Sequence, residues 1–265
     1  MSELAPSILS ADFTHLGEQL HTLEKSGTKV LHIDVMDGAF VPSISFGMPV
    51  IRSIRKDCGM FFDVHLMIQE PVRYIREFVE AGADSITVHV EACSDIQKTI
   101  DEMKQYRIKV ALSVNPATGV DAVLPYLDQI DMVLVMGVEP GFGGQKLIPQ
   151  TLEKVKELDR LRKEKGLSYQ IELDGGVNRE NLAKIIEHGT DIAVAGTAVF
   201  RGNIRENVRD LQEVIAGASR EYCTWQNYGD LCGPGRISVS SGQQGRKNGS
   251  EKNLSDSDYG WWQSL

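Results

Sequence analysis

The chain has 265 residues, of which 42% are hydrophobic and 25% charged, and its formal net charge is −9 at pH 7. A chain of this length buries a sizeable core and lies within the usual size range of a single α/β barrel domain. The acidic balance excludes a broad nucleic-acid or anionic-membrane surface, because both need clustered Lys and Arg, but a phosphorylated small molecule held by backbone donors stays possible.

Short apolar runs alternate with amphipathic segments from Ala5 to about Ala218. The predicted strands are Ala5–Leu9, Val30–Met36, Phe61–Met67, Ser85–Val90, Lys109–Val114, Met132–Met136, Gln170–Asp174 and Asp191–Ala195. Eight βα units predict a closed (β/α)8 TIM barrel, although a doubly wound open sheet has the same alternation. In both folds we expect the functional groups at the C-terminal ends of the strands.

Two of the segments between strands have a clear helical period. Leu152, Val155, Leu158 and Leu161 recur at spacing three, and Ile204, Val208, Leu211 and Ile215 suit a last helix. Both patterns are typical of helices that pack one face on a sheet.

The composition changes after this last helix to Gly, Ser, Asn and Gln without a sustained period. We therefore assign residues 1–218 to the barrel domain and residues 219–265 to an appended C-terminal tail. All three tryptophans, Trp225, Trp261 and Trp262, lie in this tail. Two interpretations stay open, a disordered or loosely structured extension and a docking segment whose aromatic side chains anchor on a partner.

Cysteine usage and the N-terminal residues indicate the compartment. The four cysteines, at positions 58, 93, 223 and 232, have no CxxC spacing, which favours a reducing environment. Residues 1–13 lack a basic stretch followed by an apolar one, and no run reaches the roughly 18 apolar residues of a membrane span. We expect a cytoplasmic protein with no membrane partner and no nucleic-acid partner.

An imidazole and a carboxylate interrupt the apolar strand Val30–Met36. Side chains alternate faces along a strand, so His32, Asp34 and Met36 project together. A buried carboxylate without a partner is costly, so a metal, a partner group or a proton-transfer role is expected.

The same oddity recurs on two later strands. Asp63, His65 and Met67 share one face of the third strand, and Asp174 ends the seventh. Two histidines and two aspartates, His32, Asp34, His65 and Asp174, can therefore meet at one barrel mouth. This mixed donor set suits one divalent ion, Zn, Fe(II), Co or Mn, and the two carboxylates can also act as acid and base.

Glycines follow the sixth, seventh and eighth strands. Gly141, Gly143 and Gly144 permit close backbone approach to an anion. Gly175-Gly176 and Gly196-Thr197 lie after the strands where barrels often bind phosphate. Met36, Met67 and Met136 end three strands, where they form either an apolar ceiling over the site or ordinary core. Ser7, at the end of the first predicted strand, could donate to a substrate hydroxyl.

Five motifs occur in a fixed order along the chain. They are Ser7-Ile8-Leu9-Ser10-Ala11-Asp12-Phe13, His32 to Gly38, Asp63-Val64-His65-Leu66-Met67, the Pro140 to Gln145 loop and Asp174-Gly175-Gly176-Val177. With these motifs the chain resembles the ribulose-phosphate 3-epimerase family from residue 4 to about residue 217. The resemblance implies a (β/α)8 barrel that interconverts D-ribulose 5-phosphate and D-xylulose 5-phosphate in pentose phosphate metabolism.

The resemblance also implies roles for individual residues. His32, Asp34, His65 and Asp174 would bind the divalent metal, and Asp34 and Asp174 would exchange protons with C3 on opposite faces of the sugar through an enediolate. Ser7 and His65 would touch the substrate, and Met36, Met67 and Met136 would pack against the enediolate. The phosphate would be held by Gly141, Phe142, Gly143, Gly144, Gly175, Gly176, Gly196 and Thr197.

Alternatives to this function differ in substrate or in chemistry. A hexulose-phosphate 3-epimerase acting on allulose 6-phosphate would share the metal and the carboxylates, and a non-catalytic sugar-phosphate-binding barrel would keep the fold alone. Related barrels that use an Asp-x-Lys-x-x-Asp pattern are disfavoured, because Met36 stands where their lysine would be. Gly137 replaces a more usual Ser or Thr, and we expect it to loosen its loop. The assembly, homo-oligomer or monomer, stays open.

Overall fold

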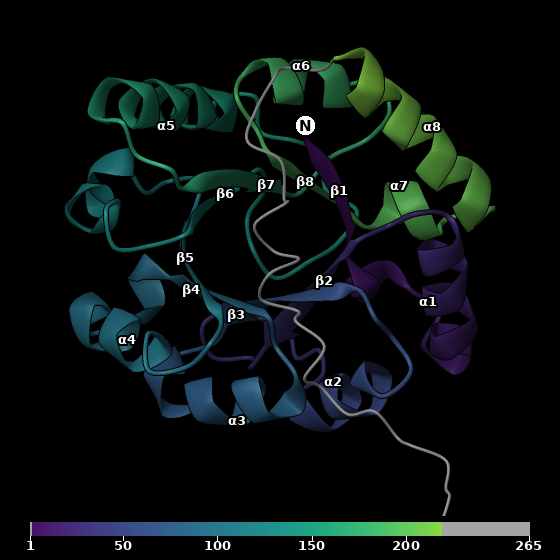
Figure 1. Ribbon diagram of the computed structural model, residues 1–265, viewed down its shortest axis with the longest axis horizontal. Coiled ribbons are helices and arrows are strands. Elements are labelled where there is room, and N and C mark those ends of the chain that lie inside the picture. The colour runs from purple at the N-terminus through teal and green to yellow at the C-terminus, as the bar shows by residue number, and fades with distance from the viewer. Residues whose placement is uncertain (1, 219–265) are drawn as a thin grey trace, which may run out of the picture. The chain divides into compact units, whose positions relative to one another are not determined.

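The computed structural model describes residues 2–218, which form a parallel eight-stranded barrel surrounded by helices (Figure 1). The strands are β1 Glu3–Pro6, β2 Val30–Met36, β3 Phe61–Met67, β4 Ser85–His89, β5 Lys109–Val114, β6 Met132–Met136, β7 Gln170–Asp174 and β8 Ile192–Ala195. They are hydrogen-bonded in the order β1-β8-β7-β6-β5-β4-β3-β2. The predicted TIM barrel is confirmed, and the open doubly wound sheet is excluded.

The first strand differs from its predicted range. It ends at Pro6, and Ile8–Ser10 forms a 3-10 helix instead of extending the strand to Leu9. The side chain of Ser7 accepts a hydrogen bond from the backbone N–H of Leu9 (3.3 Å) and so caps this turn. Ser7 also makes an isolated parallel bridge with His32 of β2, which closes the barrel between its first two strands.

Helices cover the outside of the barrel. They are α1 Leu16–Lys25, α2 Met48–Arg55, α3 Ile75–Ala81, α4 Ile96–Met103, α5 Thr151–Lys165, α6 Leu182–Glu187, α7 Thr197–Phe200 and α8 Ile204–Gly217. The connection from β5 to β6 departs from the expected pattern, because two 3-10 segments, Val120–Ala122 and Leu124–Tyr126, stand there in place of an α-helix.

The alternation of strand residues separates two environments. Ile33, Val35 and Leu66 point outward and join the main core between the sheet and the helices. The apolar stripe of α5 from Leu152 and that of α8 from Ile204 are buried against this core, as their spacing predicts. The polar residues of these strands, such as His32, lie on the opposite face and therefore point into the barrel.

Two further expectations concern the C-terminal extension and the absence of a membrane span. The predicted extension, residues 219–265, lies outside the described residues. Within residues 2–218, no helix has both the length and the apolar content that a bilayer crossing demands.

Candidate active site

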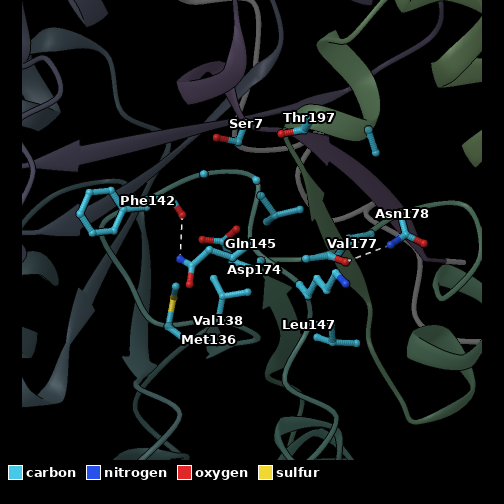
Figure 2. Close-up of a pocket in the computed structure, with 18 of the residues that line it drawn as sticks. Ser7, Met136, Val138, Phe142, Gln145, Leu147, Asp174, Val177, Asn178 and Thr197 are labelled. Carbon is cyan, nitrogen blue, oxygen red and sulfur yellow. Dashed lines mark hydrogen bonds between the residues drawn. The ribbon is translucent and has the colours of Figure 1, made fainter.

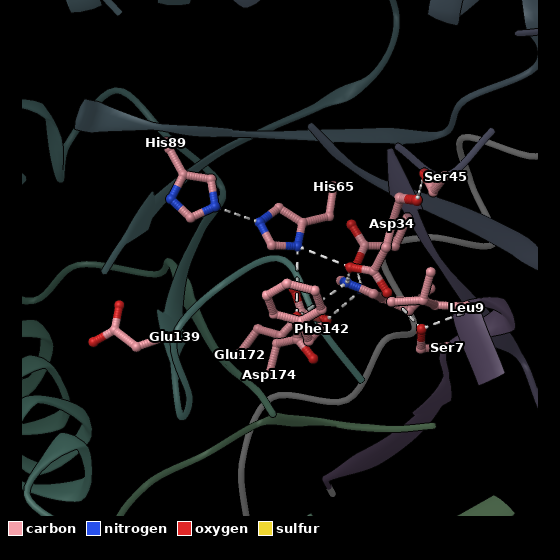
Figure 3. Close-up of polar contacts among 12 residues, drawn as sticks. Ser7, Leu9, Asp34, Ser45, His65, His89, Glu139, Phe142, Glu172 and Asp174 are labelled. Atoms are coloured by element: carbon pink, nitrogen blue, oxygen red, sulfur yellow. Dashed lines mark hydrogen bonds and ion pairs between the residues drawn. The ribbon is translucent and has the colours of Figure 1, made fainter. Parts of the chain in front are cut away.

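Four side chains from three strands converge at the C-terminal end of the barrel (Figure 3). Nε2 of His32 lies 3.3 Å from Oδ1 of Asp34 and 3.7 Å from Oδ2 of Asp174. Nδ1 of His65 lies 3.2 Å from the same Asp34 oxygen and 3.5 Å from the same Asp174 oxygen. Ligand atoms about 2.0–2.2 Å from one tetrahedral ion lie about 3.4 Å apart, so these atoms have the spacing of a single cation's donor set.

The electrostatics of this cluster favour positive charge at its centre. Burial favours the neutral form of His32, but the Asp34 and Glu172 carboxylates outweigh it and raise the pKa of His32 well above its usual value. For His65 burial again opposes the charge, and the Asp174 and Asp34 carboxylates raise its pKa to about 9. Burial disfavours ionised Asp34, yet the two imidazoles hold its pKa below the usual range. A divalent cation would supply the positive charge that these carboxylates attract.

The other nitrogen of His32 is held by carboxylates deeper in the barrel. Its Nδ1 donates to Oδ2 of Asp63 (2.8 Å), and Oε1 of Glu172 lies 3.4 Å away. In the neutral form of His32 this arrangement leaves the lone pair on Nε2, which is buried and has no hydrogen-bond partner among the described residues. A neutral imidazole anchored in this way by a carboxylate is the usual form of a histidine ligand.

Glu172 is a member of the site that the sequence analysis did not single out. It lies two residues before Asp174 on the same inward face of β7 and is completely buried. Burial and the neighbouring charge of Asp63 raise the pKa of Glu172 to about 8. Side chains two residues apart on a strand share a face, so the alternation that identified Asp174 also predicts that Glu172 points inward.

His89 is a second missed residue, at the end of β4. Its Nε2 lies 2.8 Å from Nε2 of His65 (Figure 3). Burial lowers the pKa of His89 to about 4, despite its contact with Glu91. A single histidine at the end of an apolar strand resembles an ordinary core residue, and only the strand register brings it to His65.

Ser7 directly follows the end of β1 and lies beside the cluster. Its Oγ donates to Oδ2 of Asp34 (2.5 Å). One oxygen of Asp34 is therefore held by Ser7, while the other faces both imidazoles.

A cavity of about 820 Å³ opens at the cluster, and Asp34 and Asp174 form part of its lining. Figure 2 shows Asp174 among the residues that line it. The other expected residues that line it are Ser7, Met36, Met67, Met136, Gly141, Phe142, Gly143, Gly144, Gly175, Gly176, Gly196 and Thr197. His32 and His65 are not among the lining residues. His65 is fully buried, and its expected contact with substrate stays a prediction.

The three expected methionines lie on different sides of the cavity. Met36 and Met67 pack together with Val41, whereas Met136 packs with Leu134 and Val138. The cavity thus has apolar walls around two carboxylates, and such walls exclude water from the reacting groups.

The loops after β6 and β7 pack closely against each other. Gly176 has a φ of +72°, and a Cβ there would lie 2.2 Å from the backbone nitrogen of Leu147. Gly137 donates its N–H to the Asp174 carbonyl (2.6 Å), and a Cβ on it would lie 2.6 Å from the Gly175 carbonyl oxygen. Gly137 therefore lets two backbones approach, and the expectation that it loosens its loop stays a prediction.

Three cationic side chains that the sequence analysis did not assign to the site also line the cavity. They are Lys146, Lys184 and Arg201. All three belong to segments that follow β6, β7 or β8. Glu139 and Glu180 from the same segments also line the cavity, so the three cations leave a small excess of positive charge there, which favours an anionic ligand.

Proteins of similar fold include the 3-keto-L-gulonate-6-phosphate decarboxylase of Vibrio cholerae. The two align with a TM-score of 0.62 at 17% identity, over 83% of this chain and 99% of that one. This likeness supports the barrel fold alone.

Similarity in sequence is much closer to one family. Ribulose-phosphate 3-epimerase of Bacillus subtilis is 47% identical over 201 residues, which cover 76% of this chain and 93% of that protein. The Escherichia coli K12 protein of the same name is 39% identical over 82% of this chain and 98% of its own length. The family model described as "Ribulose-phosphate 3 epimerase family" matches residues 3–200. The chain therefore belongs to the ribulose-phosphate 3-epimerase family.

Proposed function

We propose that this protein interconverts D-ribulose 5-phosphate and D-xylulose 5-phosphate by proton transfer at C3. The observation that carries the proposal is the pair of carboxylates, Asp34 and Asp174, which approach the same His32 nitrogen from β2 and β7 at the floor of one cavity. Relatives 39–47% identical to this chain carry the name ribulose-phosphate 3-epimerase, which favours the pentulose over allulose 6-phosphate.

His32, Asp34, His65 and Asp174 would hold one divalent ion. Two imidazole nitrogens and two carboxylate oxygens suit Zn, Fe(II), Co or Mn, and the unpartnered Nε2 of His32 supports a bound cation at this point. The ion would supply positive charge that stabilises the negative charge developing on the substrate oxygens. Elemental analysis of protein purified without added metal would identify the ion.

Asp34 and Asp174 would exchange the proton. One carboxylate removes the C3 proton, whose bonding electrons form a C2–C3 double bond while the π electrons of the C2 carbonyl move onto its oxygen, which gives an enediolate. The other carboxylate then donates a proton to C3 from the opposite face, and the carbonyl re-forms. The residue that acts as base in one direction acts as acid in the other. The hydrogen bond from Ser7 keeps the Asp34 carboxylate oriented. Met36, Met67 and Met136 would pack against the planar intermediate.

The glycine-rich loops would bind the phosphate. Backbone N–H groups of Gly141 to Gly144, Gly175, Gly176, Gly196 and Thr197 offer donors, and Lys184 and Arg201 add positive charge on the same side. The cytoplasmic location and the formation of a homo-oligomer stay predictions.

Steady-state assays in deuterated water test this function. We expect a much higher kcat/KM for ribulose 5-phosphate than for allulose 6-phosphate, and we expect deuterium at C3 of the product. A higher kcat/KM for the hexulose would reassign the substrate. Binding of either sugar phosphate without turnover would indicate a non-catalytic barrel, and retention of the original C3 hydrogen would contradict the two-carboxylate mechanism.

Deleting residues 219–265 should leave the epimerase activity within about twofold of the full chain. The reason is that the cavity and the metal cluster are built from residues 7–201. Comparison of kcat, KM and soluble yield between the two chains checks this prediction. A collapse of any of them would contradict the boundary that we propose at residue 218.

A further inference from the structure

We propose that His89 and Glu91 are positioning residues that fix the tautomer of His65 and thereby set the affinity of the metal site. This inference rests on the metal-dependent function proposed above, but neither residue belongs to the proposed ligand set. Both lie at the end of β4 or just after it, next to β3 in the sheet.

The geometry of the two imidazoles points to a hydrogen bond in the plane of the rings. The His65 and His89 rings are inclined by only 21°, and their Nε2 atoms are 2.8 Å apart. Their centroids are 4.9 Å apart, which exceeds the nitrogen separation by about two ring radii. The rings therefore meet edge to edge, and one nitrogen must donate while the other accepts.

The direction of this hydrogen bond follows from the other nitrogen of His65. Nδ1 of His65 faces Asp34 and Asp174, so it needs a lone pair to bind a cation. Nε2 of His65 then carries the hydrogen and donates to Nε2 of His89. His89 in turn carries its hydrogen on Nδ1.

Glu91 is placed to accept that hydrogen. Its Oε2 lies 3.4 Å from Nδ1 of His89, within ion-pair range but without hydrogen-bond geometry, so this is the weaker link of the chain. Its Oε1 accepts the backbone N–H of Asn115 (2.8 Å) in the loop after β5. The carbonyls of Asn115 and Pro116 are bound by Nζ of Lys154 on α5, both at 2.8 Å. The chain of contacts from His65 therefore ends on a loop that is itself tied to a helix.

The two histidine ligands are thus held differently. His32 donates directly to a carboxylate, Asp63, whereas His65 donates to a neutral imidazole and reaches a carboxylate only through it. A carboxylate acceptor raises the basicity of a ligating imidazole more than a neutral acceptor does. Loss of the His89 acceptor should lower the metal affinity, because His65 would no longer be held in the binding tautomer.

A pair of amide variants isolates the acceptor. In His89→Gln the amide stands as far along the side chain as Nε2 and can still accept from His65. In His89→Asn it stands at the level of Nδ1 and cannot reach His65. The two substitutions are similar in polarity. We expect His89→Asn to lose about 10- to 100-fold in Zn²⁺ affinity and His89→Gln to stay close to the wild type.

The affinities are measured on the full chain by competition for Zn²⁺ with a chromophoric chelator, with circular dichroism to confirm the fold. Ser113→Ala serves as the control, because Ser113 is buried opposite His89 on β5 and should leave Zn²⁺ binding unchanged. Glu91→Gln should cause a smaller loss than His89→Asn. Equal affinities for His89→Asn and the wild type would overturn the inference.

Nitrogen NMR of the zinc-loaded wild type provides an independent test of the tautomer. We expect a hydrogen on Nε2 of His65 and none on Nδ1. A hydrogen on Nδ1 in the loaded protein would overturn the inference while leaving the epimerase function intact. A wild-type protein that binds no divalent cation at all would overturn both proposals.

Discussion

Asp174→Asn and Asp34→Asn should each lower kcat by about 10³-fold or more while leaving the barrel folded. Asparagine has the shape of aspartate but neither accepts a proton at neutral pH nor offers a charged metal ligand. Positioned acid–base catalysis contributes about 10²–10⁴-fold, so loss of one of two carboxylates removes most of the rate. The measurement is kcat in both directions, with metal content and circular dichroism recorded for each variant.

Isotope exchange distinguishes loss of a proton carrier from loss of the metal. If metal is retained, the remaining carboxylate can still remove and return a proton on its own face, so each variant should exchange the C3 hydrogen of one epimer with solvent without inverting it. The two variants should act on opposite epimers. Asp101→Asn on the exposed side of α4 is the control and should leave kcat unchanged. Near-normal turnover in either active-site variant would contradict the two-carboxylate mechanism.

Arg162→Met should lower the free energy of unfolding by about 3–5 kcal/mol, the cost of breaking a buried ion pair. Arg162 on α5 is buried and contacts the Asp191 carboxylate just before β8 and the Asp159 carboxylate (3.0 Å). Its guanidinium also donates to the carbonyls of Tyr169 and Gly189, both at 3.2 Å. Without it, the Asp191 carboxylate stays buried and has lost its cationic partner.

Urea denaturation measures this loss, and Arg160→Met is the matched control. Arg160 lies on the same helix, and its contact with Glu164 is exposed, so its removal should change stability little. Because the Arg162 cluster lies where β7 and β8 begin, opposite the cavity, the metal affinity of folded Arg162→Met should equal that of the wild type. A variant as stable as the wild type would show that the ion pair contributes no net stability.

The sequence predicted five of the eight strands with the bounds that the structure has. The bounds of β2, β3, β5, β6 and β7 agree with the predicted ranges, since the outward-facing positions of each strand are apolar and pack on the helices. The predicted end of the first strand was wrong because the side chain of Ser7 caps a 3-10 turn within an apolar stretch. The 3-10 segments before β6 were missed because the choice between them and an α-helix depends on packing in the folded chain.

The prediction of the site followed from alternation within strands and from the family resemblance. Alternation and the resemblance each identify individual residues. Neither predicts the register between neighbouring strands. Asp34 lies opposite His65 across β2 and β3, and His89 comes to His65 only through the pairing of β3 with β4. His89 was therefore missed, although its strand was predicted to within one residue.

The isolated bridge between Ser7 and His32 connects the candidate active site with the closure of the barrel. Strands β1 and β2 stand at the two ends of the hydrogen-bonded ladder, and among the described residues this bridge is the pairing that joins them. The same two residues contact Asp34, one through a hydroxyl and the other through an imidazole. A ligand bound at His32 and Asp34 therefore stabilises the joint that turns an eight-stranded ribbon into a barrel, and loading the site and closing the ring are linked equilibria.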